Sequence, residues 1–255
     1  PKTTNVAREA VLASTLNNDI PAFTVTMACI SSNVATTSIC DMINLGKIQV
    51  GVAGGVETFS DPPIRLSKNL RQALTKTQKI KSFGGYLKLL RTLKLKDIIP
   101  DVPSASEFST GHTMGRGCER LAQRLAVTRE ETDAFALRSH KLAGKAYQNG
   151  YFENMLFPMH VKPKFTTIDK DDGPRPQSTL EDLLKLRPAF DKKLGVNTAA
   201  NSSFLADGAS AVLLANLDWC KNNNIIPTAT IEDYIYSAGD PLEELLLGPS
   251  LTIPK

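Results

Sequence analysis

The sequence contains few of the residues that build covalently tied or metal-bound folds. Its 255 residues include four cysteines and three histidines, and none of them forms a Cys-x-x-Cys or His-x-x-x-His pair. This sparsity argues against a disulfide scaffold and against a zinc site. If one helix carries both Cys29 and Cys40, their separation of roughly 16 Å is too long for a disulfide bond. We therefore expect free thiols in a reducing compartment and no metal.

Long, uniformly apolar runs are also missing. The stretch Pro21–Cys40 has no charged residue and is long enough to span a bilayer, but Thr, Ser and Asn interrupt it throughout. A spanning helix is more uniformly apolar, so a buried strand followed by a buried helix fits this stretch better. The sequence begins without Met or an apolar signal core and stops without a closing element. We expect a fragment that carries no targeting segment.

What the sequence does contain is an ordinary globular composition, 42% hydrophobic and 22% charged, with a net charge of +4. Its length fits one large domain or two modest ones. Residues 23–28 and 48–53 have strand character, and residues 31–45 between them form a helical pattern rich in small residues. Strand, helix and strand in this order indicate a parallel α/β unit. Other expected elements are helices over 4–16 and 117–125, a helix from the capping box at Thr128 toward Gly150, a buried strand over 209–215, a strand over 228–236, a short helix over 218–222, and irregular surface loop over 157–191.

The segment Ile64–Lys96 carries ten basic residues and no acidic one. Leucine-rich faces oppose the basic ones at helical spacing on both sides of Gly84-Gly85, which predicts a basic helical hairpin over 64–99. Three interpretations remain open: a solvated helix pair packed on its own domain, a hairpin lying on an anionic membrane, or a nucleic-acid patch. Because aromatic residues for base stacking are few, we rank the membrane first and nucleic acid last. The predicted membrane-facing residues are Leu66, Leu70, Tyr86, Leu89, Leu90, Leu93, Lys88 and Arg91.

Cys29, in the stretch Val25–Asn33, lies where the expected strand ends and the expected helix begins. Unpaired N–H groups in the first turn of a helix favour a thiolate, lower the thiol pKa below ~8.5 and can hold an oxyanion. Cysteine is also among the most buried residue types, so Cys29 could simply fill space in the core. Spacing alone favours this second interpretation.

The other thiols and imidazoles have stronger structural explanations. Cys40 is expected in the core and Cys220 partly exposed, while Cys118, near a helix start, is the one rival nucleophile. His140 is expected on the surface of a charged helix, and His112 lies in a loop where ligand contact is open. These residues assemble neither a Ser-His-Asp triad nor a phosphate loop.

Several sequence blocks resemble the thiolase family. Val25–Asn33 followed by Gly54–Ser60 resembles the family's acyl-accepting cysteine and the glycine-glycine turn that follows it. Met114-Gly115, Phe135–His140 and Asn201–Ala209 resemble later blocks in the same order. Any one block is weak evidence, but together they are specific, and the resemblance covers essentially the whole chain.

Two features are most similar to the trifunctional branch of that family: the sequence Cys29-Ile30-Ser31-Ser32-Asn33 and the basic hairpin. The resemblance implies a long-chain 3-ketoacyl-CoA thiolase of fatty-acid β-oxidation, on the matrix side of the mitochondrial inner membrane. Cys29 would attack the 3-keto carbon, with its backbone N–H in the oxyanion hole, and pass the acyl group to CoA. Ser203 would lie along the CoA pantetheine arm, and His112 near the block that contacts CoA, offset by one position.

The resemblance also implies partners. These are 3-ketoacyl-CoA and CoA as substrates, a second thiolase subunit in a homodimer, a hydratase/dehydrogenase alpha subunit and an anionic membrane surface, with no nucleic acid. CoA would act as a co-substrate, and no bound cofactor is implied.

The sequence departs from the family pattern in several respects. Cys29-Ile30-Ser31-Ser32 replaces the common Cys-x-Ser-Gly, and the opening strand of the fold is missing. The family's Asn-Glu-Ala-Phe block, Gly-His-Pro histidine and Cys-x-Gly-Gly-Gly cysteine, which activate the nucleophile and handle the acetyl carbanion, are absent. We therefore expect this chain alone to be catalytically inert. A non-catalytic thiolase-fold subunit, a membrane-docking scaffold and a condensing ketosynthase remain as alternatives.

The expected fold class is α/β, a partial thiolase-type layered core with an inserted, mainly helical loop domain. Residues 1–60 would hold part of the N-terminal core, 61–195 the inserted domain, 196–236 the return to core strands, and 237–255 the truncated start of the second core half.

Overall fold

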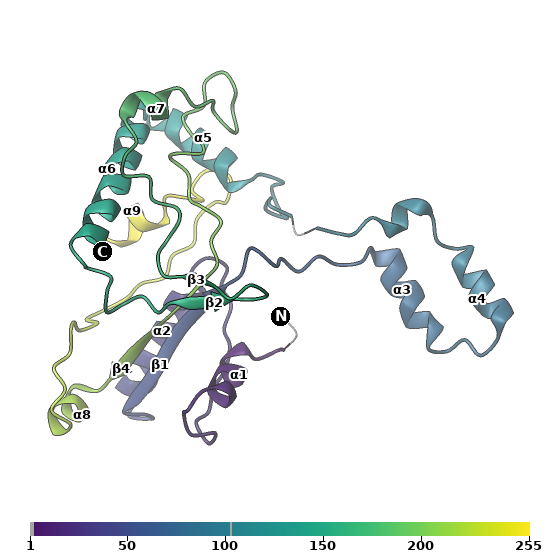
Figure 1. The fold of residues 1–255 in the computed structure, drawn as a ribbon, viewed down its shortest axis with the longest axis horizontal. Helices are drawn as coiled ribbons and strands as arrows, with labels where there is room; N and C mark the ends of the chain where they lie inside the picture. The colour runs from purple at the N-terminus through teal and green to yellow at the C-terminus, as the bar shows by residue number, and fades with distance from the viewer. Residues whose placement is uncertain (1–2, 103) are drawn as a thin grey trace. The chain divides into compact units, whose positions relative to one another are not determined.

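The structure of the chain is a computed structural model that describes residues 3–102 and 104–255. The chain divides into two compact units, whose elements are labelled in Figure 1. The first comprises Pro1–Pro103 and Leu205–Tyr234, and the second comprises Ser104–Phe204 and Ile235–Lys255. Each unit contains helices and a two-stranded sheet of its own.

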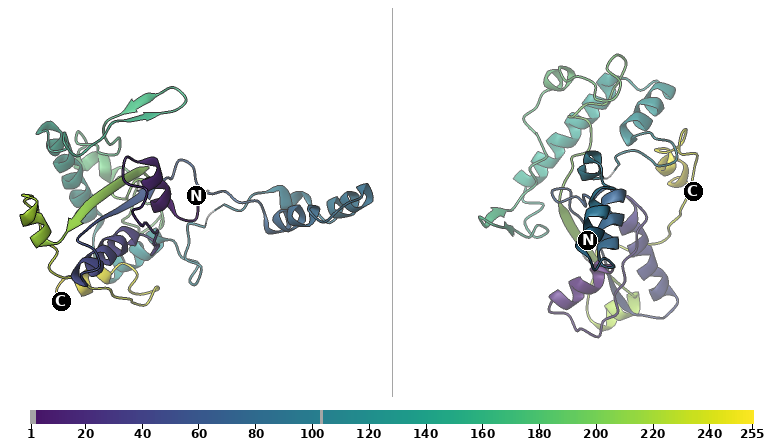
Figure 2. Two further views of the ribbon diagram at one scale, coloured as in Figure 1. Left: turned by 90° about the horizontal axis from the view of Figure 1, so that it is seen from below. Right: turned by 90° about the vertical axis from the view of Figure 1, so that its right-hand side faces the viewer.

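The first unit is built on an antiparallel strand pair covered by one helix. β1 (Val50–Glu57) pairs with β4 (Gly208–Ala215) from one end to the other. α2 (Ser31–Asn44) packs against both strands, and Ile43 and Ala53 are buried in this unit. Figure 2 shows α2 running beside the paired strands. The predicted helix over 31–45 is confirmed, and its small residues let it lie close to the sheet. The strand predicted over 209–215 forms as β4, but the prediction that it is buried is wrong, because most of its residues are exposed.

The predicted parallel unit is wrong, because the structure forms no strand over 23–28. Side chains make the contacts of this segment: the Met27 N–H donates to the Ser31 hydroxyl at 2.8 Å, and the Thr24 hydroxyl bonds to Asn5 and Ala7. Asn5 Nδ2 donates to the carbonyl oxygen of Ala22 at 2.9 Å, and the Thr24 hydroxyl accepts the N–H of Ala7 at 3.1 Å. Asn5 is also the N-cap of α1 (Val6–Ala13), so the first helix and the extended segment are fastened together.

The predicted strand over 48–53 is shifted, because β1 runs through Gly54-Gly55 and does not end there. In the ladder Gly54 faces Ala211 and Gly55 faces Ser210. Glycine weakens a strand interior and marks places where another group approaches closely. Here the Ser210 backbone comes close to Gly54, and the Ser32 side chain comes close to Gly55.

A helical hairpin occupies the basic segment. α3 (Lys68–Thr77) and α4 (Phe83–Leu90) begin at the serine N-caps Ser67 and Ser82, and a 3₁₀ turn follows at Leu95–Ile98. The buried Asp97 closes the hairpin, because its Oδ1 accepts from Asn69 Nδ2 at 2.9 Å and its Oδ2 from the Lys94 N–H at 2.8 Å. These bonds, the Lys94 N–H first, hold the pKa of the Asp97 carboxyl below its usual range.

The second unit is mainly helical. α5 (Met114–Arg124) starts at Thr113 and α6 (Arg129–Gln148) at Thr128, where the predicted capping box with Glu131 is present. Its remaining elements are β2 (Met159–Val161) paired with β3 (Thr166–Ile168), α7 (Leu180–Leu184), which contacts α6, and α9 (Gly248–Thr252).

Two further sequence predictions are wrong. The irregular loop predicted over 157–191 contains β2, β3 and α7, whose start is fixed by a capping box between Thr179 and Asp182. The strand predicted over 228–236 is absent, because this segment is held by side chains. The Tyr234 hydroxyl donates to the carboxylate of Asp41 at 2.8 Å. The short helix predicted over 218–222 is confirmed as α8 (Leu217–Asn222).

Within residues 3–102 and 104–255, every helix is too short or too polar to cross a bilayer.

Candidate functional site

The turn Met27–Ser31 presents the Cys29 thiol to solvent immediately before α2. Ile30 is the N-cap residue, so Cys29 lies one residue ahead of the cap and not inside the first helical turn. Its side chain is exposed, which excludes the interpretation that it fills the core. Ala28 has a φ of 47°, a left-handed conformation that is uncommon for any residue except glycine. Strained backbone of this kind is concentrated at functional sites.

Ser31 holds this turn in place. Its hydroxyl accepts the Met27 N–H at 2.8 Å and donates to the carbonyl oxygen of Ala28 at 2.7 Å. Ile30 has no side-chain oxygen, and no described side chain caps α2. The Ser31 N–H is bonded to the Ala28 carbonyl oxygen at 3.3 Å, so within the first turn it is the N–H groups of Ser32 and Asn33 that can bind water or an anionic oxygen near the thiol.

Gly54 and Gly55 allow the start of α2 to lie against β1. A Cβ atom at Gly55 would overlap the hydroxyl oxygen of Ser32, and one at Gly54 would come within 2.8 Å of the Ser210 carbonyl oxygen. A side chain at Gly55 would force the Ser32 hydroxyl to move, and one at Gly54 would press on the backbone of β4. Gly55 is thus the position at which β1 meets the helix start that follows the Cys29 turn.

Asp207 fastens the end of β1 to the start of β4. Its Oδ1 accepts the N–H groups of Phe59 at 2.7 Å and Ser60 at 2.9 Å, and its Oδ2 accepts the Ser60 hydroxyl. The Ser60 hydroxyl, followed by the two N–H groups, holds the pKa of the Asp207 carboxyl below its usual range. The Gly54–Ser60 block is therefore a strand end closed by a carboxylate.

In the second unit, a group that we name the Asp133 cluster (the buried Asp133 with the half-buried Arg129 and Asn201) organises the segment before Ser203. Asn201 Nδ2 donates to Asp133 Oδ1 and to the Val196 carbonyl oxygen, both at 2.8 Å, and Asn201 Oδ1 accepts the Thr198 N–H at 2.7 Å. Asp133 is fully buried, and Arg129 Nε donates to its Oδ2 at 2.6 Å. A second Arg129 nitrogen donates to carbonyl oxygens of the α7 region. Sequence reasoning missed this cluster, although Asn201 begins one of the family-like blocks.

The two predicted CoA-contacting residues lie in this second unit, and Cys29 lies in the first. Ser203 is exposed, and its hydroxyl donates to the Phe204 carbonyl oxygen at 3.3 Å. His112 is half-buried in the turn before α5, where its backbone N–H donates to the Thr110 hydroxyl at 3.2 Å. The roles of all three residues remain predictions.

The rival thiol Cys118 lies inside α5 and is half-buried. Its S–H donates to Asn197 Oδ1 at 3.2 Å, and burial raises the pKa of the thiol. Burial likewise raises the pKa of the half-buried Cys40. A nucleophilic cysteine needs a lowered thiol pKa, so both environments oppose the thiolate. The expectation that Cys220 is partly exposed is wrong, since it is buried.

The expectation that His140 is a surface residue is also wrong. The side chain is half-buried in α6, and both ring nitrogens have partners in other segments. No sequence pattern signalled this, because the partners are backbone groups distant in the sequence.

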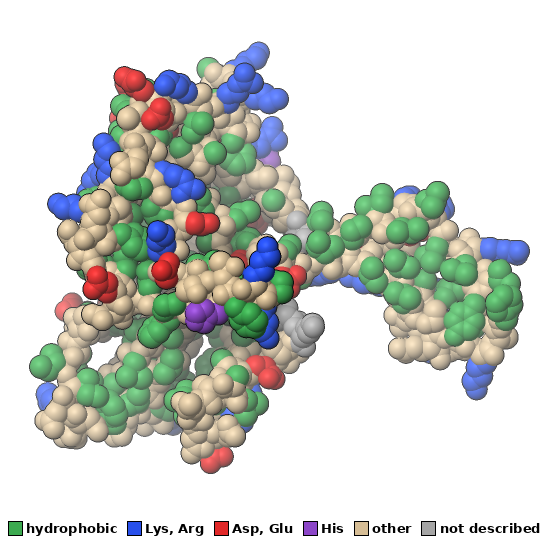
Figure 3. Space-filling model, viewed as in Figure 1, with side chains coloured by type: hydrophobic (Ala, Val, Ile, Leu, Met, Phe, Trp, Pro, Cys, Tyr) green, Lys and Arg blue, Asp and Glu red, His purple; other side chains and the backbone are tan. Residues whose placement is uncertain are grey.

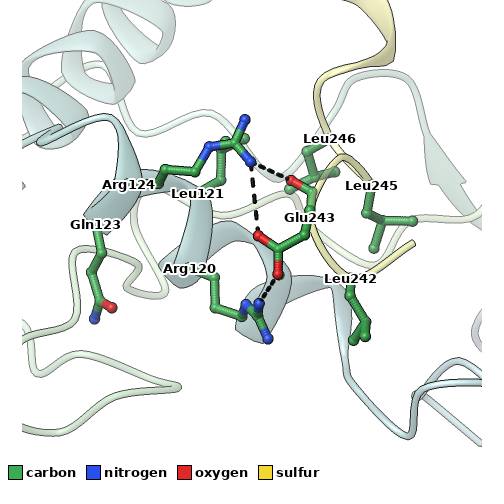
Figure 4. Close-up of a pocket in the computed structure, with 9 residues that line it drawn as sticks. Arg120, Leu121, Gln123, Arg124, Leu242, Glu243, Leu245 and Leu246 are labelled. Carbon is green, nitrogen blue, oxygen red and sulfur yellow. Dashed lines mark hydrogen bonds and ion pairs between the residues drawn. The ribbon is translucent and has the colours of Figure 1, made fainter. Parts of the chain in front are cut away.

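A pocket on α5 is closed by an acidic residue from the C-terminal segment. Figure 4 shows Arg120 and Arg124 on either side of Glu243, with Leu242, Leu245 and Leu246 around it. Arg120 is ion-paired with Glu243, and Arg124 Nη1 donates to the Glu243 carbonyl oxygen at 3.2 Å. Since the cations already have this acidic partner, we read the pocket as a docking contact within the second unit. Across the described ranges, no three His, Cys, Asp or Glu side chains are arranged to hold a metal ion.

The chain belongs to the thiolase family, because the model of the thiolase N-terminal domain matches residues 1–218. The mitochondrial trifunctional enzyme subunit beta of Mus musculus is 48% identical over 254 residues. That match covers 100% of this chain and 53% of the mouse protein, so the chain spans about half the length of the curated relatives it matches.

Solved structures support the same fold. The crystal structure of human mitochondrial 3-ketoacyl-CoA thiolase matches with a TM-score of 0.79 and 31% identity, over 97% of this chain and 58% of the human one. The same human enzyme in complex with CoA matches with a TM-score of 0.67 and 31% identity, over 87% of this chain and 51% of that one. The predicted family and the predicted α/β thiolase-type fold are therefore confirmed.

Proposed function

We propose that the protein carrying this chain is an acetyl-CoA acyltransferase, a 3-ketoacyl-CoA thiolase of fatty-acid β-oxidation, with Cys29 as its nucleophile. One observation carries the proposal: Cys29 is exposed beside the uncapped start of α2. The rival Cys118 is half-buried and bonded to Asn197, and burial raises the pKa of its thiol. The names of the mouse and human relatives supply the reaction and the substrate class.

The reaction is a two-step acyl transfer. The Cys29 thiolate attacks the 3-keto carbon, and the oxyanion that forms is held by N–H groups at the start of α2. The bond between C2 and C3 then breaks, and the acetyl-CoA carbanion takes up a proton as it leaves. The thiolate of free CoA next attacks the acyl-Cys29 thioester. This step releases an acyl-CoA whose chain is shorter by two carbons and restores the Cys29 thiolate.

CoA acts here as a co-substrate. Ser203 is the proposed contact for its pantetheine arm, supported by its exposed hydroxyl two residues after Asn201, which is bonded to Asp133. His112 is a weaker proposed contact, because its turn directly precedes α5. The complex of the human relative with CoA supports this substrate.

The partners and location of the protein follow from its relatives. The name of the mouse trifunctional subunit suggests a mitochondrial protein that works with an alpha subunit, which we propose carries the hydratase and dehydrogenase steps. We also propose a thiolase homodimer and the matrix side of the inner membrane.

The hairpin offers a second proposed activity, attachment to an anionic membrane. Figure 3 shows hydrophobic side chains gathered over α3 and α4. Phe83 is 80% exposed and Leu90 62% exposed, although they lie among Lys and Arg side chains. Of the predicted membrane-facing residues, Leu66, Tyr86, Leu90, Lys88 and Arg91 are exposed, while Leu70, Leu89 and Leu93 are half-buried. The half-buried leucines are better assigned to packing within the hairpin, which leaves the exposed set to meet lipid.

The nucleophile is tested by trapping the acyl-enzyme. The gene product that contains this chain is incubated with a 3-ketoacyl-CoA, quenched in acid and digested for mass spectrometry. We expect the acyl mass on Cys29, and Cys29→Ser should lower turnover by at least about a thousandfold. The matched variant Cys118→Ser should keep the wild-type rate. Acyl mass on Cys118, or turnover by Cys29→Ser, would contradict the proposal. The same assay on residues 1–255 alone tests the expectation that this chain is inert by itself.

The membrane proposal is tested by vesicle flotation with and without cardiolipin. The double variant Phe83→Ser with Leu90→Ser should lose binding to anionic vesicles. Leu45→Ser, at an exposed leucine after α2, serves as the matched control. Binding that does not depend on lipid charge would refute the electrostatic part of the proposal.

A further inference from the structure

His140 joins two segments of the second unit through both of its ring nitrogens. Nδ1 accepts the backbone N–H of Arg175 at 3.2 Å, and Nε2 lies 3.3 Å from the carbonyl oxygen of Ala200. Because a backbone N–H can only donate, Nδ1 carries no proton. In this arrangement the ring N–H is on Nε2, where it donates to the Ala200 carbonyl oxygen.

The same imidazole packs against Phe204. The two ring centroids are 6.1 Å apart with an interplanar angle of 49°. The Phe204 ring also lies so close to Gly173 that an added Cβ would come within 2.6 Å of it. The Arg175 guanidinium folds back onto the carbonyl oxygens of Gly173 and Pro174 at 3.0 and 3.1 Å, which closes the loop 172–175 on itself. His140 thus fastens a closed loop to the segment 200–204.

Helix α6 holds the segment 200–204 at two points. Asp133 binds Asn201, and His140, seven residues later and therefore on the same face of the helix, binds Ala200 and packs on Phe204. Ser203 lies between the two attached residues Asn201 and Phe204. Its backbone position is set by the helix, although its own side chain is exposed.

We propose that His140 is a positioning residue for CoA: it sets the segment that carries Ser203 and so determines the affinity for CoA, without touching the reacting atoms. This inference rests on the proposed function. Loss of the imidazole frees the segment 200–204 and leaves the Arg175 N–H and the Ala200 carbonyl without their partner. CoA affinity then falls, whereas the attack of Cys29 on a bound acyl-CoA proceeds unchanged.

Three substitutions separate the contributions of the ring. His140→Asn keeps an acceptor near Nδ1, His140→Gln keeps a donor near Nε2, and His140→Phe keeps only the packing on Phe204. His160→Phe, at an exposed histidine of β2 in the same unit, is the matched control. In the gene product that contains this chain, His140→Phe should raise the KM and the Kd for CoA about tenfold with kcat unchanged. Asn and Gln should give smaller increases, and the control none.

Two readouts do not depend on turnover. The ¹⁵N spectrum of the His140 ring should show one protonated nitrogen, Nε2, and His140→Phe should speed amide exchange over 173–175 and 200–204. Unchanged CoA affinity in all three variants overturns the inference, as does an equal loss in the His160→Phe control. If His140→Phe does not fold, the Asn and Gln variants decide the matter.

Failure of this inference is distinguishable from failure of the proposed function. An acyl-Cys29 adduct with unchanged CoA affinity in the His140 variants refutes the positioning role alone. Absence of the adduct refutes the thiolase reaction, and direct CoA binding to the His140 variants still decides the positioning role. A wild-type protein that binds no CoA overturns both.

Discussion

Asp133 illustrates how a single buried charge can order a long stretch of chain. It is fully buried, yet each carboxylate oxygen has a partner, Arg129 on one side and Asn201 on the other. A buried ion pair is weak evidence for net stability, but removing one member leaves an uncompensated charge in the interior. The main effect of the Asp133 carboxylate on stability is therefore that its loss would leave Arg129 and Asn201 without a partner.

Asp133→Ala should destabilise the protein by about 3–5 kcal/mol, because Arg129 and Asn201 lose their shared partner. Asp218→Ala removes the acid of the exposed pair with Lys221 and should cost less than about 1 kcal/mol. Thermal unfolding followed by circular dichroism compares the two. Equal losses would show that burial of Asp133 has no special weight.

Asp207 makes stability depend on pH at the low end of the range. Its folded pKa is lowered from the ordinary 3.8 by the Ser60 hydroxyl and the neighbouring N–H groups. A lowered folded pKa means that the carboxylate stabilises the native state above the ordinary value and stops doing so as pH falls through the folded value. The stability advantage of wild type over Asp207→Asn should thus be constant above about pH 5 and shrink in more acidic solution.

Urea unfolding at a series of pH values measures this advantage. The single tryptophan, Trp219, lies in the same unit as Asp207 and reports its unfolding by fluorescence. An advantage that grows toward low pH would mean that the sign of the coupling is reversed.

At the scale of elements, the contact between α2 and β1 controls the setting of Cys29. Gly55 and Ser32 lie so close together that a Cβ atom at position 55 would overlap the Ser32 hydroxyl oxygen. The Ser31-bonded turn and the exposed Cys29 thiol lie immediately before this contact in the chain.

Gly55→Ala should destabilise the first unit by about 1–3 kcal/mol, because the new methyl group displaces the Ser32 hydroxyl. Adding Ser32→Ala removes the obstructing oxygen and should restore most of the loss. Trp219 fluorescence in urea measures both variants, and alkylation of Cys29 reports whether the turn has moved. Additive losses in the double variant would disprove the steric explanation.

The elements also show how far sequence reasoning reaches. α2 and α6 were predictable because their signals are local: a run of small residues, and the Thr128–Glu131 capping box. The strands over 23–28 and 228–236 were not, because a strand exists only with a partner, and these segments bond to Asn5 and Asp41 instead. Cys29 could be singled out from its neighbours and the family resemblance. His140 and Asn201 could not be assigned, since their partners come together only in the fold.

At the scale of the whole chain, two separate interiors coexist. Ile43 and Ala53 are buried in the first unit, whereas Ala122 and Leu183 are buried in the second. Substitutions should therefore loosen one interior at a time.

Amide hydrogen exchange tests this separation. Asp133→Ala should speed exchange in α6, α7 and residues 196–204, while α2, β1 and β4 keep wild-type rates, because the Asp133 cluster lies entirely in the second unit. Gly55→Ala should give the opposite pattern. Faster exchange in both units from either substitution would mean that they unfold as one cooperative body.

The small β2–β3 hairpin has a practical consequence. Every residue from Met159 to Ile168 is exposed, and the Asp133 cluster reunites the chain on either side of it without using any of these residues. A fluorescent or epitope tag inserted between Val161 and Thr166 should consequently leave the fold and its stability unchanged. We expect such a labelled protein to be visible in living cells and to keep the chemistry proposed for Cys29.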